Sequence, residues 1–298
     1  MASLIVRRTL RPAIVALAVV AASAVWVSVR AAAPSRIVST SPSITETLFA
    51  LGLGSRVVGV STFCRFPPEV QKLPKVGTFL KPDAELIAGL RPDLVVIHET
   101  ANGIDRRLTS LHIPFVVVDR GSTESVFTSI RQIGAAAGVP DRATALVTEI
   151  ERTLETLRAR NRSTTRPRVL FVIGRRSGML ADLIGVGPGT YLDDLIEIGG
   201  GTNVLNIAGQ PEFPRISMET VLRFDPDVII DTVDMGVQES ARVPPAEVER
   251  LWSAYPTLTA VKTKRLYAAT IDALVVPGPR IAVAAEWVSD LLHRGPRP

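Results

Sequence analysis

Two stretches of this sequence are near copies of one another. Residues 83–96 read DAELIAGLRPDLVV, and residues 217–230 read SMETVLRFDPDVII, at a constant offset of 134 residues without gaps. Each copy predicts an N-cap residue, a short helix, a Pro-Asp turn and a buried strand. Glu85 and Glu219 occupy the same position in the two copies. The repeat therefore predicts two related lobes, and the cleft between two lobes is a favoured place for a ligand.

Short apolar runs alternate with helical patterns through the rest of the chain. Continuous apolar runs are typical of parallel strands whose sheet is covered by helices on both faces. The predicted strands are 37–38, 94–97, 115–118, 169–173, 228–230 and 266–268. A helix is predicted from Ser43 and Glu46, which have capping-box spacing, to near Gly52. This alternation of strands and helices predicts an α/β fold.

One segment in the middle of the chain breaks this alternation. Residues 141–160 form a long helical pattern, whose apolar residues share one stripe: Leu146, Ile150, Leu154 and Leu157. Twenty helical residues span about 30 Å, the diameter of a small domain. We therefore predict a helix that connects the two lobes, with an ordinary surface helix of a single domain as the alternative. The predicted division is 1–33 for targeting, 34–139 for the first lobe, 140–166 for the connecting segment and 167–298 for the second lobe.

The first 33 residues have the pattern of a secretory signal. Arg7, Arg8 and Arg11 are followed by eighteen uncharged residues, 12–29, and then by the small residues 31–33 that suit a signal peptidase. An uncleaved membrane anchor is the alternative, because eighteen residues are near the lower limit for crossing a bilayer. In both cases the rest of the chain is predicted to be exported to the periplasm.

The net charge of the chain comes mainly from this segment. The formal net charge is +5, but residues 1–33 hold four arginines and no acidic residue. The remainder has 30 basic and 29 acidic residues. Such a balance does not favour nucleic acid as a partner.

The only cysteine of the sequence is Cys64, so an internal disulfide is excluded. We predict that it is buried as a small apolar residue, with a reactive or intermolecular thiol as the alternative. No cysteine lies beside the cleavage region. A soluble periplasmic protein is therefore favoured over a lipoprotein.

Several motifs, in this order and spacing, resemble the cobalamin and iron-siderophore periplasmic binding proteins. Residues 36–46, RIVSTSPSITE, resemble the first strand, loop and helix of that family. VGVS at 58–61 leads to FPPEV at 66–70, RPDLV follows at 91–95, and Pro279-Arg280 opens the last helix. The resemblance covers nearly all of the chain after the first 33 residues. It implies two Rossmann-like α/β lobes joined by one long rigid helix, the class III fold of substrate-binding proteins.

The resemblance is greatest to the cobalamin-binding member. It implies a substrate-binding component of an ABC importer, which captures a corrinoid in the interlobe cleft and delivers it to a permease in the inner membrane. The residues that it places around the cleft are Phe63, Phe66, Phe79, His98, Phe213, Asp272 and Arg280. Aromatic walls suit a large planar ligand, because stacking covers much area at little ordering cost.

This chain departs from the cobalamin-binding member within that set. Tryptophans of that member correspond to Phe79, His98 and Phe213, and a tyrosine corresponds to Phe63. The aromatic character is mostly kept while polar edges are lost, so a ferric siderophore or haem is the alternative ligand. Five arginines could serve an anionic siderophore through charge-assisted hydrogen bonds: Arg65, Arg175, Arg176, Arg215 and Arg280. Of these, we expect only Arg280 and Arg215 near the cleft.

His98 directly follows a predicted buried strand, where α/β folds place residues that contact ligands. It could stack, form hydrogen bonds or bind a metal, and a plain loop histidine is the alternative. His112 and His293 are poorly placed for a ligand role. A carrier of free zinc or manganese needs several histidines and carboxylates around one ion, so three histidines in all disfavour that function.

The resemblance also implies one glutamate on each lobe that docks into arginine pockets of a permease dimer. These positions correspond to Glu85 and Glu219, which the repeat already pairs. Two separated carboxylates on rigid lobes specify orientation on a two-fold partner. A solvated helix residue is the alternative for each of them.

Motifs of common enzymes are absent from the sequence. It contains no G-x-S-x-G, H-E-x-x-H or G-x-x-x-x-G-K-[ST] motif. This absence favours a binding protein over an enzyme. The resemblance implies a ligand that itself contains a metal, and we expect a monomer without a cofactor of its own. A periplasmic enzyme, or a sensor that never meets a permease, is the alternative.

Overall fold

The computed structural model describes residues 33–99, 103–119, 121–162, 165–232, 245–269 and 271–294. The predicted signal peptide or anchor lies outside the described residues, apart from Ala33. Within the described ranges, no helix is both long enough and apolar enough to cross a membrane.

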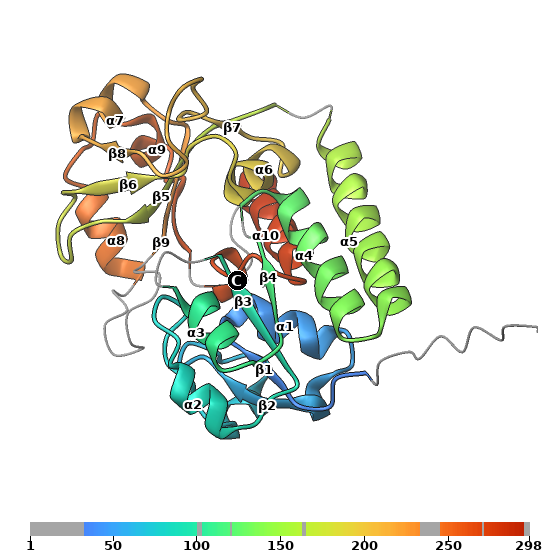
Figure 1. Ribbon diagram of the computed structural model, residues 1–298. Coiled ribbons are helices and arrows are strands. Elements are labelled where there is room, and N and C mark those ends of the chain that lie inside the picture. Colours follow the sequence, from blue (N-terminus) through green and yellow to red (C-terminus); the bar gives the residue numbers. More distant parts are fainter. Residues whose placement is uncertain are drawn as a thin grey trace, which may run out of the picture. The chain divides into compact units, whose positions relative to one another are not determined.

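The first sheet is a parallel four-stranded sheet with the strand order β2-β1-β3-β4 (Figure 1). Its strands are β1 (Ile37–Ser39), β2 (Val57–Val60), β3 (Leu94–His98) and β4 (Phe115–Val118). Its helices are α1 (Pro42–Ala50), α2 (Ala84–Gly89), α3 (Ile104–Ser110) and α4 (Thr123–Ala136). The three strands predicted in this half of the chain are present, although β4 is only partly buried. The helix predicted from Ser43 is also present, but it begins at Pro42 and its N-cap is Ser41, so the predicted capping box of Ser43 and Glu46 is wrong.

The second sheet has six strands, with the order β10-β9-β5-β6-β8 and β7 paired to β5. Its strands are β5 (Arg168–Gly174), β6 (Leu183–Gly185), β7 (Thr202–Asn203), β8 (Arg215–Ile216), β9 (Val228–Thr232) and β10 (Leu266–Ala269). Its helices are α6 (Tyr191–Ile198), α7 (Met218–Phe224), α8 (Pro245–Trp252), α9 (Thr259–Lys262) and α10 (Ile281–Arg294). β6 runs antiparallel to both β5 and β8, whereas the sequence predicted only parallel strands.

Successive strand residues alternate between two apolar layers, as expected for sheets covered on both faces. In β5, Val169 and Phe171 pack in the core that contains α6 and α10. Leu170 and Val172 point the other way and pack with residues of α7, α8 and α9. The first sheet is divided in the same way, with α1 and α4 on one face and α2 and α3 on the other.

α5 (Pro140–Asn161) is the long helix that the leucine stripe predicted. Ile150, Leu154 and Leu157 are buried, whereas Leu146 is only partly buried. The helix packs against α4, which follows the first sheet, and against α6 and α10, which belong to the second (Figure 1). Its apolar face therefore joins one core that is continuous over both halves, which opposes hinge bending between them.

The two copies of the repeat adopt the same local structure. Asp83 caps α2 and Ser217 caps α7, each through its side-chain oxygen. Each short helix is followed by a left-handed residue, at Arg91 with φ 48° and at Asp225 with φ 40°. A buried strand then begins, β3 in one copy and β9 in the other.

The aspartates of the two Pro-Asp turns also make matching contacts. The Asp93 side chain accepts hydrogen bonds from the backbone N–H groups of Ser35 and Arg36, both at 2.8 Å. The Asp227 side chain accepts one from the backbone N–H of Arg168, also at 2.8 Å. Each aspartate thus fixes the chain at the start of another strand of its own sheet, β1 or β5. The two copies of the repeat thus make the same kind of hydrogen bond within their own sheets.

Candidate ligand-binding site

The carboxyl ends of strands from both sheets meet at one interface. Ser43 is in α1, which begins just after β1, and its Oγ lies 3.0 Å from Nε2 of His98 at the end of β3. Gly278 follows β10 in the second sheet and packs closely on Ser43, since a Cβ atom at Gly278 would lie 3.4 Å from Ser43 Cα. Ligands of α/β proteins bind at the carboxyl ends of the strands, so this interface is the candidate site.

An ion pair crosses the interface. Arg280 Nη2 donates to Glu46 Oε1 at 2.5 Å, and Arg280 Nε donates to Glu46 Oε2 at 2.8 Å. Asp272 Oδ2 lies 3.9 Å from the same Nη2. The Glu46 side chain is only 2% exposed. Burial raises the pKa of Glu46, and the hydrogen bonds and charge of Arg280 oppose that rise only in part.

The guanidinium of Arg280 also covers an aromatic ring. It lies 4.3 Å from the ring centroid of Phe66, which is within the range of a cation–π contact. Phe66 remains 43% exposed. The structure thus brings together three predicted site residues, Phe66, Asp272 and Arg280. Because Glu46 neutralises Arg280, this arginine is not an unpaired cation for an anionic ligand.

Two further predicted aromatics lie together in the first half of the chain. Phe63 and Phe79 pack edge to face, with ring centroids 5.8 Å apart and an interplanar angle of 62°. The backbone around them is fixed, since Thr62 N–H donates to the carbonyl of Gly77 at 2.9 Å. Both rings are partly exposed. Phe213 belongs to the other half, before β8, and is 44% exposed.

His98 is buried, with 6% of its surface exposed. Its Nδ1 lies 3.1 Å from the carbonyl oxygen of Val118, and its Nε2 lies 3.0 Å from Ser43 Oγ. Since a carbonyl only accepts, these contacts suit a neutral ring with the proton on Nδ1 and Nε2 accepting from Ser43. Both nitrogens are therefore used to join β3, β4 and α1. This arrangement favours a positioning role for His98. Direct contact between His98 and a ligand stays a prediction.

The other arginines of the second half differ from one another in exposure and in pairing. Arg215 is exposed, and Arg176 is exposed and paired with Asp182 at 2.6 Å. Arg175, which we did not expect near the cleft, has a side chain only 5% exposed. Its position directly after a buried strand was the signal in the sequence. Pairing and burial depend on residues far along the chain, which a local pattern does not reveal.

Arg175 belongs to a buried polar cluster. Its Nε lies 3.1 Å from Oδ2 of Asp231, which is fully buried. The indole Nε1 of Trp252 donates to the same carboxylate oxygen at 2.8 Å. Burial raises the pKa of Asp231, against the opposing effects of Arg175 and Trp252.

Comparison with known proteins identifies the family to which this architecture belongs. A family model described as "Periplasmic binding protein" matches residues 37–273. The chain belongs to the periplasmic binding protein family. Its fold is the class III fold of that family, with two α/β lobes joined by one long helix.

Two curated relatives of this periplasmic binding protein cover most of the chain. An uncharacterized ABC transporter substrate-binding lipoprotein YvrC from Bacillus subtilis (strain 168) is 29% identical, over 87% of this chain and 80% of the relative. A vitamin B12-binding protein from Pectobacterium carotovorum subsp. carotovorum (strain PC1) is 27% identical, over 88% of this chain and 89% of the relative.

A solved structure is similar over the same region. The periplasmic heme-binding protein RhuT from Roseiflexus sp. RS-1, in apo form, is 28% identical and gives a TM-score of 0.73. The match covers 87% of this chain and 99% of that chain. Two of these similar proteins are thus named for different ligands, vitamin B12 and heme.

The two glutamates of the repeat lie on the surface of this periplasmic binding protein. Glu85 is the second residue of α2 and Glu219 the second residue of α7. The Glu85 side chain is 86% exposed and lies 3.7 Å from Arg107, a weak surface pair. An exposed leucine is close to each glutamate in its helix, Leu86 in α2 and Leu222 in α7.

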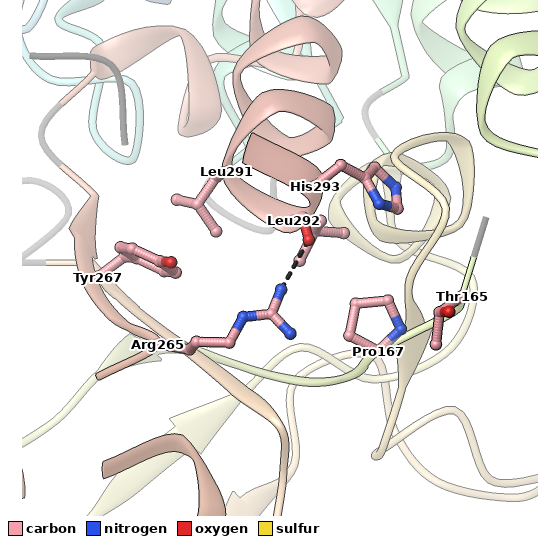
Figure 2. Close-up of a pocket in the computed structure, with 7 residues that line it drawn as sticks. All are labelled: Thr165, Pro167, Arg265, Tyr267, Leu291, Leu292 and His293. Atoms are coloured by element: carbon pink, nitrogen blue, oxygen red, sulfur yellow. Dashed lines mark hydrogen bonds between the residues drawn. The ribbon is translucent and has the colours of Figure 1, made fainter. Parts of the chain in front are cut away.

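A separate pocket of about 360 Å³ lies on the second lobe (Figure 2). Its lining residues are Thr165, Pro167, Arg265, Tyr267, Leu291, Leu292 and His293. Arg265 Nη2 donates to the carbonyl oxygen of Leu292 at 2.6 Å, so its guanidinium caps the end of α10 (Figure 2). None of the predicted ligand residues lines this pocket.

The described residues contain no group of three or more His, Cys, Asp or Glu side chains that could hold a metal ion. Cys64 is buried, as predicted, and its Sγ lies 3.1 Å from Thr45 Oγ1. Burial raises the pKa of the Cys64 thiol to about 11.

Proposed function

We propose that this substrate-binding protein of an ABC importer captures a corrinoid between its two lobes. The observation that carries the proposal is the set of accessible phenylalanines at the carboxyl edge of the first lobe. Phe66 is exposed beside the neutralised Arg280, and Phe63 and Phe79 form an edge-to-face pair. Rings of this kind provide apolar area for a large flat macrocycle.

The charges at the site agree with a ligand of low net charge. Arg280 is paired with Glu46, and Arg175 is paired with Asp231. A highly anionic ferric siderophore would be better served by arginines without carboxylate partners. The name of the 27% identical vitamin B12-binding relative supports a corrinoid. Haem is the second candidate, supported by the name of the 28% identical solved structure.

We further propose that Glu85 and Glu219 dock on the permease, and that the chain is secreted to the periplasm through its N-terminal segment. The two glutamates lie on short helices of equivalent units and are both exposed. Exposure leaves them accessible to a partner whose surface is basic.

Binding to the purified protein tests the proposed ligand. Cyanocobalamin, dicyanocobinamide, haemin and a ferric hydroxamate siderophore are titrated separately, with absorbance spectra and thermal unfolding as readouts. We expect a spectral change and an increase in melting temperature with the two corrinoids. Binding of haemin or of the siderophore alone would contradict the corrinoid proposal.

Two variants test the aromatic site. Phe66→Ala and Phe79→Ala each remove a ring that we place against the ligand, and each should weaken corrinoid binding by about 1–3 kcal/mol. Leu111→Ala is the matched control, because Leu111 is an exposed apolar residue that follows α3 and is not among the proposed site residues. Equal affinities for all three variants and the unchanged protein would rule out this site.

A further inference from the structure

The buried cluster around Asp231 contains a charged donor for which the described part of the chain offers no acceptor. Nη2 of Arg175 is buried and has no hydrogen-bond partner among the described residues. Asp231 accepts from Nε of the same guanidinium, at 3.1 Å and 3.4 Å, and from the indole of Trp252. An ionised donor that is buried without an acceptor costs more free energy than a neutral one. No residue that the structure describes supplies that acceptor, which leaves Nη2 available to a ligand atom.

The cluster lies at the edge of the second sheet that faces the first lobe. Arg175 directly follows β5, and Asp231 is the fourth residue of β9, the neighbouring strand. β9 pairs in parallel with β10, and the chain after β10 runs through Asp272 to Gly278 and Arg280, which contact the first lobe. Arg175 is therefore at the same carboxyl edge as the proposed cleft.

The position of the guanidinium is fixed before any ligand arrives. Asp231 is fully buried and belongs to a central strand, and Trp252, which is also fully buried, holds its carboxylate from α8. A donor that is already oriented loses little entropy on binding. Arg280 differs, because Glu46 already accepts from both its Nε and its Nη2.

We propose that Arg175 determines ligand specificity by donating from Nη2 to an oxyanion, a phosphate or carboxylate oxygen, at the periphery of the bound macrocycle. This inference rests on the proposed function, since it assumes a macrocyclic ligand between the lobes. The Asp231 partner keeps the site close to neutral, so one oxyanion is favoured over a polyanion. Cyanocobalamin carries one phosphodiester, and haem carries two carboxylates.

The test compares ligands that have or lack the oxyanion. Affinities of the unchanged protein and of Arg175→Lys are measured for cyanocobalamin and for dicyanocobinamide, which lacks the phosphodiester. Haemin and its dimethyl ester form a second pair. Lysine retains the charge beside Asp231 but has a single ammonium in place of the fork of donors. We expect a loss of about 10- to 100-fold for the oxyanion-bearing ligand of whichever pair binds, and less than 3-fold for its counterpart.

Arg176→Lys is the matched control, because Arg176 is the adjacent residue but is exposed and paired with Asp182. It should change neither affinity. Thermal unfolding of each variant without ligand separates folding from recognition. If Arg175→Lys does not fold, the double variant Arg175→Met with Asp231→Asn takes its place, since it removes both buried charges together.

The outcomes distinguish this inference from the proposed function. If the unchanged protein binds neither macrocycle pair, the proposed function fails and the inference fails with it. If it binds a pair and the Arg175 variant loses both members equally, or neither, the proposed function stands and the oxyanion role is wrong. A loss confined to the oxyanion-bearing member supports it.

Discussion

Arg280, which immediately precedes α10, donates two hydrogen bonds to Glu46 of α1, and these residues are 234 positions apart. The pair connects the second lobe to the first at the carboxyl edge of both sheets. Glu46 is almost fully buried, whereas the Arg280 side chain is 21% exposed. Removing the arginine would therefore leave a buried carboxylate without its counterion, which is far more costly than losing a surface pair.

Replacing Arg280 with methionine should lower the free energy of unfolding by about 3 kcal/mol near neutral pH. Burial already raises the pKa of Glu46, and loss of the arginine removes the main opposing effect. The proton is then bound more tightly in the folded state than in the unfolded state. The variant should be most stable below the unfolded pKa, near 4.5, and should lose stability as pH rises through the folded pKa. Urea unfolding at a series of pH values from about 4 to about 8 measures this dependence.

A second substitution provides the control. Glu46→Gln in the Arg280→Met background removes the buried charge, so much of the lost stability should return and the added pH dependence should disappear. If Arg280→Met alone unfolds at the same urea concentration as the unchanged protein at neutral pH, the ion pair does not stabilise the lobe interface.

Cys64 should be almost unreactive in the folded protein. Burial raises the pKa of its thiol to about 11, so only about 0.1% would be thiolate at pH 8. Iodoacetamide at pH 8, followed by intact mass measurement, should label the folded protein at least about 100-fold more slowly than the protein in urea. Rapid labelling of the folded chain would show that the thiol is accessible.

Asp93 should support the start of β1 only while it is ionised. Although desolvation raises the pKa of Asp93, hydrogen bonds from the N–H groups of Ser35 and Arg36 and from the Ser35 hydroxyl outweigh it and lower the pKa. The contribution to stability is therefore present above the ordinary value of 3.8 and is lost as pH falls through the lower folded pKa. Asp93→Asn should cost about 1 kcal/mol at pH 7 and reduce the acid sensitivity of unfolding.

The corresponding substitution in the second lobe tests whether the two aspartates of the repeat contribute similarly to the free energy of unfolding. Asp227→Asn alters the equivalent contact with the backbone N–H of Arg168 and should cost about 1 kcal/mol as well. The two effects should add, because each aspartate acts within its own sheet. A strongly cooperative loss in the double variant would contradict this independence.

Local patterns in the sequence predicted much of the fold. The strands at residues 37–39, 94–98 and 168–174 each contain a continuous apolar run, and α5 has a clear helical stripe, so their prediction depends on nearby residues alone. β6 and β8 are three and two residues long and pair antiparallel with one another, and such short strands carry too few residues for a periodic signal.

The candidate site was less predictable than the fold. Phe66 and Arg280 were both expected near the cleft and do lie in contact. The pairing of the arginines was not evident, because Arg280 is neutralised by Glu46 from the other lobe and Arg175 is paired with Asp231 from the neighbouring strand. Such partners are set by tertiary packing between distant positions, so a residue type alone does not reveal whether its charge is available.

Charge reversal at Glu85 and Glu219 should impair delivery of the ligand without impairing its capture. Both glutamates are exposed, Glu85 on α2 and Glu219 on α7, and neither is among the proposed ligand residues. Arginine at either position would place like charges together at a basic permease surface, which costs several kcal/mol where the contact is well buried. Uptake of labelled ligand by cells should therefore fall at least about 10-fold in Glu85→Arg, Glu219→Arg and the double variant.

Glu124→Arg is the matched control for Glu85→Arg. Glu124 is in α4, its side chain is 74% exposed, and it lies 3.7 Å from Arg131, much as Glu85 lies 3.7 Å from Arg107. Its reversal should leave uptake unchanged, because the loss of one surface ion pair has little effect on folding. Ligand affinity in solution is measured for every variant. Full uptake by the double variant would remove the docking role, whereas reduced affinity in a folded variant would place these glutamates at the ligand site instead of the permease contact.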